Sequence, residues 1–520
     1  MSRIRIVGGD ILETTGGNHK VYSKENIENS SDTQMIQVGK TGGVIYGDPQ
    51  KAPDIKSKFF QDKIPEYVVL FKRLPSYKGE FGWDYMRDDY LTGTCIEGLE
   101  DLKRVYKPIE IQTKNATTST SYGIYYTPWL SMFVNHNAVI GKEVELSIDA
   151  PVDFISDSVD FSKEEMTFVP STPNLRVVPD KMPIADAING GRIKIFCDAT
   201  LDADATIDIK SSKGDVVGKM NVLKNKDVDK LTINVYVIKS FIKDDPLFSK
   251  SVVDSQINSK GGLGKLEEYL NKQSLNQALI QIKIIHLEDW IFTKQTLLNT
   301  STTPNTNYTG MVRNSTSMLM DTAKYMNFIN DRFKKGYPSI AEHRGLFIYL
   351  TPFSSLTAGG ASYSTPLTSK HIILFKANLD HFPSYAHEIG HTLGLEHTFL
   401  AENLTHNEEI ADVQNKFDEE NRKQNQAKIS KTNNLRDNAA YYATHSAQKE
   451  EATKILDNNI NIYDENIKHY KEQLNVLKKN PYKFLDRRTE NIMDYDLLNQ
   501  MSFYKWQWSV MEQEAKTIYH

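Results

Sequence analysis

The feature that most constrains this chain is an eleven-residue run from His387 to His397, which reads HEIGHTLGLEH. On a helix, His387 and His391 are one turn apart on the same face, so both imidazoles can reach one metal ion. Gly394 can adopt the left-handed conformation that ends a helix, and the resulting turn can bring His397 round as a third ligand. Three protein ligands leave a coordination position for water, from which Glu388 can take a proton. The run therefore predicts a catalytic zinc site built on a helix.

Chance does not account for the full pattern, H-E-x-x-H-x-x-G-x-x-H. Histidine makes up 13 and glycine 28 of the 520 residues. Random placement then gives on the order of 10⁻⁵ to 10⁻⁴ matches in the chain. The alternative interpretation is an amphipathic helix whose histidines lie on a solvated face, or a degenerate site that has lost its activity.

Three short segments precede the motif. Leu346–Leu350 and His371–Phe375 are apolar runs typical of strands. The segment between them is small, flexible and has little to bury: Gly359, Gly360, Ala361, Ser362 and Tyr363. We expect it to form an edge strand beside a cleft, where an extended substrate could add by main-chain hydrogen bonds. A surface loop between two strands is the alternative.

Two motifs together resemble a known clan of zinc peptidases. HEIGHTLGLEHTF at His387–Phe399 and NIMDY at Asn491–Tyr495 resemble the metzincins, and within them the pappalysin family. The resemblance covers residues 230–520 and implies a zinc endopeptidase. It implies that Met493 forms a hydrophobic base beneath the metal. It also implies that Tyr495 lies near the metal and can stabilise the tetrahedral intermediate.

Composition limits the remaining possibilities. At 520 residues the chain is too long for one core and should form about three domains. A hydrophobic content of 39% with 25% charged residues is typical of a soluble globular protein, and a net charge of −5 gives no reason to expect a nucleic-acid partner. No run of eighteen apolar residues predicts a membrane span. Cys95 and Cys197 are too few for a disulfide framework and are predicted to be buried thiols.

The predicted fold class is multidomain, with two β-rich N-terminal domains followed by an α+β metzincin-like catalytic domain. Residues 1–137 are expected to form the first domain. Residues 138–229 should form an immunoglobulin-like β-sandwich, because apolar and polar residues alternate there. In 230–520, we expect a strand near 231–237, a helix near 263–278, a strand at 279–285 and a helix near 317–334, the order expected of a metzincin.

A helical insertion is predicted at about 400–482, between the metal motif and Met493. Apolar residues there are spaced alternately by four and three, the pattern of a heptad seam: Leu456, Ile460, Tyr463, Ile467, Tyr470, Leu474 and Leu477. Ile410, Val413 and Phe417 have the same spacing and could form the antiparallel partner. The predicted helical hairpin is either a packed ornament or a substrate gate or partner-docking arm.

The N-terminal region bears on where the protein is sent. Met1–Asp10 lacks the apolar core of a secretory signal peptide. Residues 1–50 together with Tyr77–Asp84 resemble N-terminal regions attached to toxins of type VI secretion systems in Bacteroidetes. The resemblance implies a secretion or loading module, export without an N-terminal signal, and a spike component and an inhibitor or immunity protein as partners. A plain β-rich accessory domain is the alternative.

The sequence thus predicts a secreted effector or toxin that cleaves a protein or peptide substrate with one Zn²⁺. The residues expected to act are Glu388 and Tyr495 in catalysis and His387, His391 and His397 as ligands. No residue pattern indicates an additional Ca²⁺. Two alternatives stay open: a cytoplasmic housekeeping metalloprotease, and a non-enzymatic structural or adaptor protein of a secretion system with a vestigial zinc site.

Overall fold

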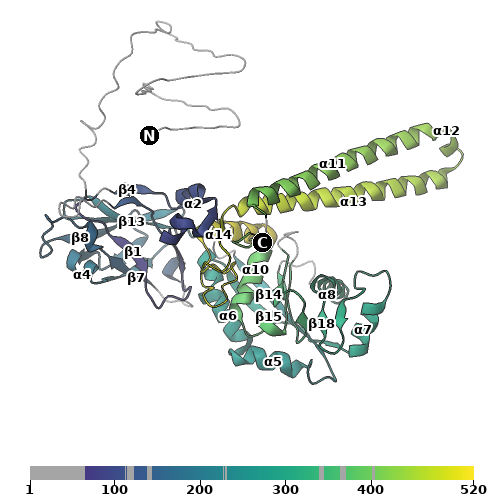
Figure 1. Cartoon of the computed structure of the whole chain (residues 1–520), viewed down its shortest axis with the longest axis horizontal. Coiled ribbons are helices and arrows are strands. Elements are labelled where there is room, and N and C mark those ends of the chain that lie inside the picture. Colours follow the sequence, from purple (N-terminus) through teal and green to yellow (C-terminus); the bar gives the residue numbers. More distant parts are fainter. Residues whose placement is uncertain are drawn as a thin grey trace, which may run out of the picture. The chain divides into compact units, whose positions relative to one another are not determined.

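The computed structural model describes residues 65–111, 113, 122–136, 143–226, 228, 231–338, 345–363, 370–400 and 404–519. These residues form a multidomain mixed α/β protein with several sheets (Figure 1). The features predicted for residues 1–64 lie outside the described residues. Within the described part, no helix has the length and apolar character needed to cross a membrane.

The N-terminal part is a sandwich of two sheets that share one core. One sheet has the order β1 (Leu70–Arg73), β7 (Val144–Asp149), β11 (Arg192–Cys197) and β9 (Leu175–Val178). The other has the order β10 (Lys181–Pro183), β8 (Glu165–Pro170), β12 (Ala205–Lys210), β13 (Val216–Val222), β6 (Trp129–Ser131) and β2 (Gly82–Asp84). In β7 and β12 every second residue is buried, as the alternation predicts.

Residues 65–136 share this sandwich with residues 143–222. Strand β1 pairs antiparallel with β7, and β6 pairs parallel with β13. Strands from before residue 137 therefore belong to both sheets, and the boundary predicted between 1–137 and 138–229 cuts through them. The sequence does not indicate that these strands belong to the sandwich, because β1 and β6 are too short to show a periodic pattern.

The C-terminal part is built on a sheet of order β15-β14-β19-β22-β21. Four of these strands run parallel: β15 (Gln281–His286), β14 (Thr232–Ile242), β19 (Leu346–Leu350) and β22 (His371–Leu374). The short strand β21 (Gly360–Ala361) lies antiparallel to β22. All residues of β19 are buried, because helices cover both faces of the sheet.

Helices pack on the two faces in separate groups (Figure 1). On one face lie α5 (Lys250–Ser259), α6 (Gly262–Lys272) and α10 (Phe382–Thr392). On the other lies α8 (Thr322–Gly336), where the Phe333 ring is 4.3 Å from that of Phe347 on β19. Between the predicted elements the chain adds β16 (Trp290–Phe292), α7 (Lys294–Thr302), β17 (Val312–Asn314) and β18 (Leu319–Met320).

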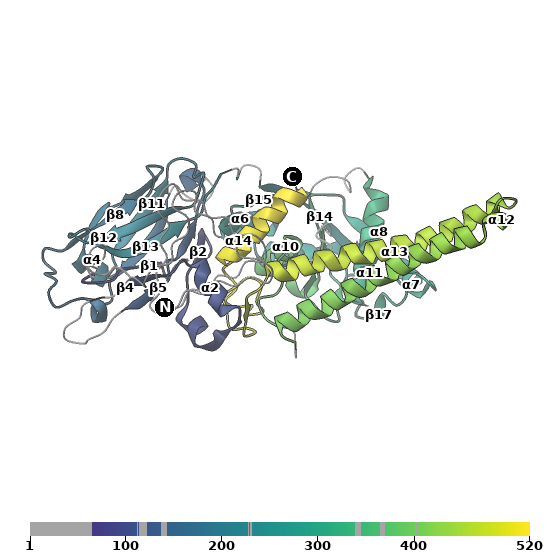
Figure 2. The same ribbon diagram turned by 90° about the horizontal axis from the view of Figure 1, so that it is seen from above.

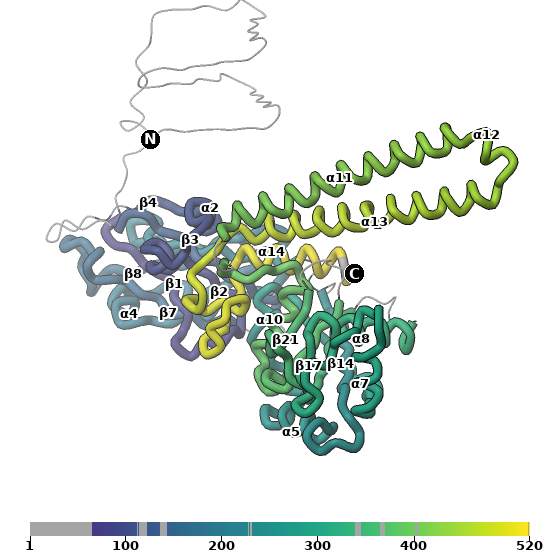
Figure 3. Tube along the Cα trace, turned by 45° about the vertical axis from the view of Figure 1, so that its right-hand side comes forward, coloured from purple at the N-terminus to yellow at the C-terminus, as the bar shows by residue number. Residues whose placement is uncertain are grey.

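The insertion forms the predicted helical hairpin. Helices α11 (His406–Asp437) and α13 (Ser446–Lys479) lie side by side and are joined through α12 (Ala439–Tyr442) (Figures 2 and 3). An apolar seam holds the base, where Ile410, Val413 and Phe417 pack with Tyr470, Leu474 and Leu477. Farther out, polar pairs such as Lys431 with Asp457 join the helices. The pairing of the two heptad stretches is therefore confirmed at the base of the hairpin.

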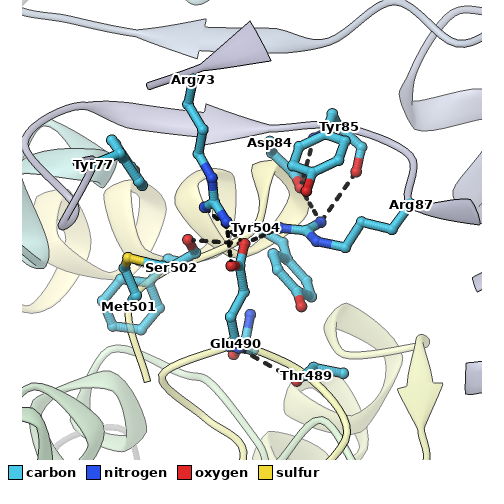
Figure 4. A network of polar contacts seen from close by, with 12 residues as sticks. Arg73, Tyr77, Asp84, Tyr85, Arg87, Thr489, Glu490, Met501, Ser502 and Tyr504 are labelled. Carbon is cyan, nitrogen blue, oxygen red and sulfur yellow. Dashed lines mark hydrogen bonds and ion pairs between the residues drawn. The ribbon is translucent and has the colours of Figure 1, made fainter. Parts of the chain in front are cut away.

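An ion-pair network joins the sandwich to the loop that precedes Met493. Arg73 of β1 donates two hydrogen bonds to the Glu490 carboxylate, at 2.9 and 2.5 Å. Arg87 donates a third to Glu490 at 2.5 Å and also bonds Asp84 at 3.1 Å (Figure 4). Paired guanidinium–carboxylate contacts of this kind are strong and directional. The sandwich therefore holds a loop of the C-terminal part in place.

The network predicts how stability depends on pH. Burial by itself raises the pKa of Glu490, but the charges and hydrogen bonds of Arg87 and Arg73 outweigh it and bring that pKa to about 2. Because this value lies below the ordinary 4.5, the ion pairs stabilise the fold above pH 4.5, and that stabilisation is lost as the pH falls toward 2. Glu490→Gln should lower the free energy of unfolding at pH 7 by about 3 kcal/mol.

Chemical denaturation of the variant at several pH values measures this effect. Its stability should also fall less steeply between pH 4.5 and 2 than that of the unsubstituted chain. Glu100→Gln, on an exposed carboxylate of α2 (Leu99–Val105), is the control and should change little. Equal losses in the two variants would contradict a special role for Glu490.

Candidate metal centre

Helix α10 carries the first two predicted ligands, and a glycine turn brings the third. His387 and His391 lie one turn apart, with ring centroids 4.8 Å from each other. Just past the helix, Gly394 has a φ of +82°, in the left-handed region that glycine adopts without strain. The turn predicted from the sequence is therefore present, and it places His397 beside the other two imidazoles.

The Nε2 atoms of the three histidines converge on one point. His397 Nε2 lies 3.3 Å from His387 Nε2 and 3.2 Å from His391 Nε2. The Nδ1 atom of His387 faces the Ile492 carbonyl oxygen at 2.8 Å, and that of His391 faces the Leu395 carbonyl oxygen at 2.8 Å. Because a carbonyl only accepts, Nδ1 carries the proton and Nε2 presents a lone pair. Lone pairs this close repel one another unless a cation lies between them, so these residues fit a metal ion.

Burial keeps these imidazoles in the neutral form that binds metals. It lowers the pKa of His387 to about 3, with the neighbouring His391 adding to the effect, and that of His391 to about 4. For His397 burial and the two neighbouring histidines lower the pKa further still. At neutral pH no proton therefore has to be displaced before an ion binds.

The predicted base, Glu388, lies against the edge strand. Ser362 Oγ donates a hydrogen bond to Glu388 Oε2 at 2.5 Å. A methyl group at Gly360 would lie 2.7 Å from Glu388 Oε1, so the strand passes this carboxylate at close range. Burial raises the pKa of Glu388 to about 7, although the Ser362 hydrogen bond lowers it. A carboxyl group with a pKa near neutrality can both accept and return a proton.

The segment predicted as an edge strand lies at the end of the sheet. Within the described ranges, Gly360–Ala361 pairs with β22 on one side and is the last strand in the order. The Gly359 carbonyl accepts a hydrogen bond from Phe375 N at 2.9 Å, and Tyr363 is partly exposed. The contact of Ser362 with the base was not predicted, since nothing in the sequence distinguishes this serine from others in loops.

Met493 is fully buried beneath helix α10. A methyl group at Gly390 would lie 2.6 Å from the Met493 sulfur, so helix and methionine pack directly against each other. The Met493 amide donates to Asn491 Oδ1 at 2.9 Å, and Asn491 in turn pairs with Gln507 of α14 (Lys505–Glu514). The methionine thus forms an apolar floor below the helix that carries the histidines.

Two aromatic rings border His397. The Tyr495 hydroxyl lies 3.0 Å from His397 Nε2, and the Tyr495 side chain is partly exposed. Phe399 stacks on the imidazole with a centroid distance of 4.8 Å and an interplanar angle of 17°. Tyr495 thus lies beside His397, and its role in stabilising an intermediate stays a prediction. The stacking of Phe399 was not predicted.

Comparison with known proteins adds little to this geometry. The sequence matches no protein-family model, and no curated protein matches it. Among solved structures, the chain is similar to one described as "Structure of a chaperone-substrate complex", with 13% identity and a TM-score of 0.20. The match covers 40% of this chain and 28% of that one. A similarity this weak supports no functional conclusion.

The packing of Met493 on Gly390 can be tested by changing both. Gly390→Ala should lower the free energy of unfolding by about 1–3 kcal/mol, because the added methyl enters the space of the sulfur. Met493→Ala should also destabilise, because it leaves a cavity. In the double variant the loss should be smaller than the sum of the single losses, since the two groups no longer compete for the same space. Chemical denaturation measures all three.

Gly264→Ala in α6 is the matched control for this experiment. A methyl group there meets no atom within 4 Å, so the substitution should be neutral or stabilise the helix by up to about 1 kcal/mol. Strictly additive losses at positions 390 and 493 would contradict the direct contact.

Proposed function

We propose that this chain is a zinc-dependent endopeptidase of the metzincin type. The observation that carries the proposal is the convergence of three neutral imidazole nitrogens beside a buried carboxylate. Neutral imidazoles suit zinc, and three of them leave a coordination position for water. His387, His391 and His397 would hold the ion, and Met493 would form the floor of the site.

The side chains around this site have separate roles in peptide hydrolysis. When bound, zinc supplies a Lewis acid that lowers the pKa of bound water to about 7 and polarises a carbonyl group. Glu388 would accept the proton of the attacking water on its carboxylate and return it to the leaving amine. The Tyr495 hydroxyl would donate a hydrogen bond to the oxyanion that develops on the substrate. Ser362 would hold the Glu388 carboxylate against β21.

The edge strand favours an extended peptide as the substrate. In the part of the chain that the structure describes, β21 has a partner strand on one side alone, so its other side can pair with an added strand. Gly360 of this strand directly contacts Glu388. A peptide that adds to the edge would therefore pass next to the base. This proximity favours peptide-bond cleavage over hydrolysis of a small ester or amide.

Whether the chain is an exported effector or a cytoplasmic housekeeping protease stays a prediction. Against the vestigial-site alternative, the three histidine nitrogens lie within 4.8 Å of one another, Glu388 lies on the same helix as His387 and His391, and Met493 packs on Gly390 of that helix. The resemblance that implies export by a type VI system rests on Tyr77–Asp84 and on residues 1–50, and the latter lie outside the described residues. Within Tyr77–Asp84, the Gly79 carbonyl accepts a hydrogen bond from Asn276 Nδ2 at 3.0 Å. This segment therefore packs on the C-terminal part. A cytoplasmic housekeeping protease stays open as the alternative.

Removal of the base tests the proposed reaction. Glu388→Ala should keep the fold and the bound zinc but lose peptidase activity by roughly 10²–10⁴-fold, because the carboxylate that would accept the proton is gone. Metal analysis together with mass spectrometry of a cleaved peptide library measures both properties. Glu268→Ala, on an exposed carboxylate of α6, is the control and should cleave normally. Undiminished cleavage by Glu388→Ala would overturn the mechanism.

The hydrogen bond from Ser362 predicts a change in the pH profile. Since this bond lowers the pKa of Glu388, Ser362→Ala should raise that pKa. The base is active when ionised, so activity rises with pH, and the variant should reach half-maximal activity at a higher pH than the unsubstituted chain. Rate measurements from pH 5 to 9 compare the two profiles. Ser355→Ala, whose hydroxyl bonds Thr322 instead, should leave the profile in place, and a similar shift in that control would argue against the assignment.

A further inference from the structure

The helical hairpin leaves and rejoins the chain beside the third ligand. Phe399 forms a parallel bridge with Phe484, and the Phe484 amide donates to the Thr398 carbonyl at 2.7 Å. The segment that leads from His397 toward the hairpin therefore lies next to the segment that returns from it. The base of the insertion is in direct contact with the backbone that carries the ligand.

Asn480 follows the last residue of α13 and is 1% exposed. Its Nδ2 donates to the Gly394 carbonyl at 2.9 Å and to the Val476 carbonyl at 2.8 Å. Its Oδ1 accepts a hydrogen bond from Glu396 N at 3.1 Å. The Asn480 carboxamide thus forms hydrogen bonds with both ends of the turn that leads into His397. Because the site is buried, water cannot easily replace these bonds when the side chain is removed.

Lys483 adds a second contact on the same side. It lies in β23 (Lys483–Phe484), is 3% exposed, and its Nζ donates to the His397 carbonyl at 2.9 Å. A buried ammonium group is costly unless it has strong acceptors, so this bond contributes to keeping the ligand's backbone in place.

The third ligand needs such support more than the other two. His387 and His391 lie within α10, whose backbone hydrogen bonds fix their positions. His397 lies beyond the helix on a glycine turn, where the helix no longer constrains it. The position of His397 beside the other two imidazoles therefore depends on the contacts that hold the Gly394 turn in place.

We propose that Asn480 and Lys483 are positioning residues that hold His397 in metal-binding geometry. The base of the hairpin then belongs to the metal centre, whereas the outer part of the hairpin does not. This inference rests on the zinc site of the proposed function. Within that site, the insertion would serve to hold His397 in position.

Zinc affinity separates positioning from general stabilisation. Asn480→Ala should weaken zinc binding by roughly 10–100-fold, the range found for residues that support metal ligands. It should also reduce the rise in Tm that zinc produces, because tighter binding to the folded state gives a larger rise. A merely structural role would lower the Tm of zinc-loaded and metal-free protein equally and leave that rise unchanged. Lys483→Met provides a second, independent variant if Asn480→Ala fails to fold.

The experiment uses the full chain and a matched control. Competition with a chromophoric zinc chelator gives the affinity, and thermal unfolding with zinc or with EDTA gives the two Tm values. Asn466→Ala is the control, because Asn466 also lies on α13 and its Nδ2 donates to Glu420 on α11 at 2.9 Å, away from the histidines. It should leave zinc affinity unchanged.

The outcomes distinguish this inference from the function on which it rests. Unchanged zinc affinity in both Asn480→Ala and Lys483→Met would overturn the inference and leave the proposed peptidase intact. An equal loss in Asn466→Ala would overturn it too, because the effect would then be a general one of the hairpin. If the unsubstituted chain binds no zinc, the proposed function fails and the inference fails with it.

Discussion

The hydrogen bond between His387 Nδ1 and the Ile492 carbonyl joins the ligand helix to a loop more than a hundred residues away in sequence. It fixes the tautomer of His387 and directs Nε2 toward the other two imidazoles. The same carbonyl also accepts a hydrogen bond from Gln500 Nε2 at 2.9 Å, so its own position is held. The next residue, Met493, packs under Gly390 of the ligand helix. The helix and this loop thus fix each other, and the geometry of the candidate metal centre depends on their contact.

The sandwich takes part in this arrangement through Glu490, two residues before Ile492. Arg73 and Arg87 bind its carboxylate from the sandwich side (Figure 4). From the sequence, residues 1–137 were expected to form a secretion or loading module or a plain β-rich accessory domain. Arg73 and Arg87 of this region hold the loop on which helix α10 rests. A buried arginine–glutamate contact contributes to such positioning because its geometry is narrow.

Local sequence patterns predicted those elements whose structure is determined by residues close together in the sequence. The histidine spacing gave the ligand helix, Gly394 gave the turn, and the heptads at 410–417 and 470–477 gave the base of the hairpin. The contacts between distant residues were not predicted. Ser362 and Asn480 are single polar residues whose partners lie 26 and 86 positions away, and no periodicity marks them. The pairing of strands across residue 137 was not predicted for the same reason, since short strands pair according to distant neighbours.

The three histidines lie far in the sequence from the residues that contact them, so the ribosome synthesises the two groups at different times. All three histidines emerge within eleven residues, but the partners that orient them, Asn480, Ile492 and Tyr495, follow 86 to 105 positions after their contacts. At roughly 5–20 residues per second, synthesis of that stretch takes on the order of 5–20 seconds. Throughout this interval His387 Nδ1 lacks its Ile492 partner and the Gly394 carbonyl lacks the hydrogen bond from Asn480. The three histidines therefore reach the geometry of the candidate metal centre only after residues 480–495 have been synthesised.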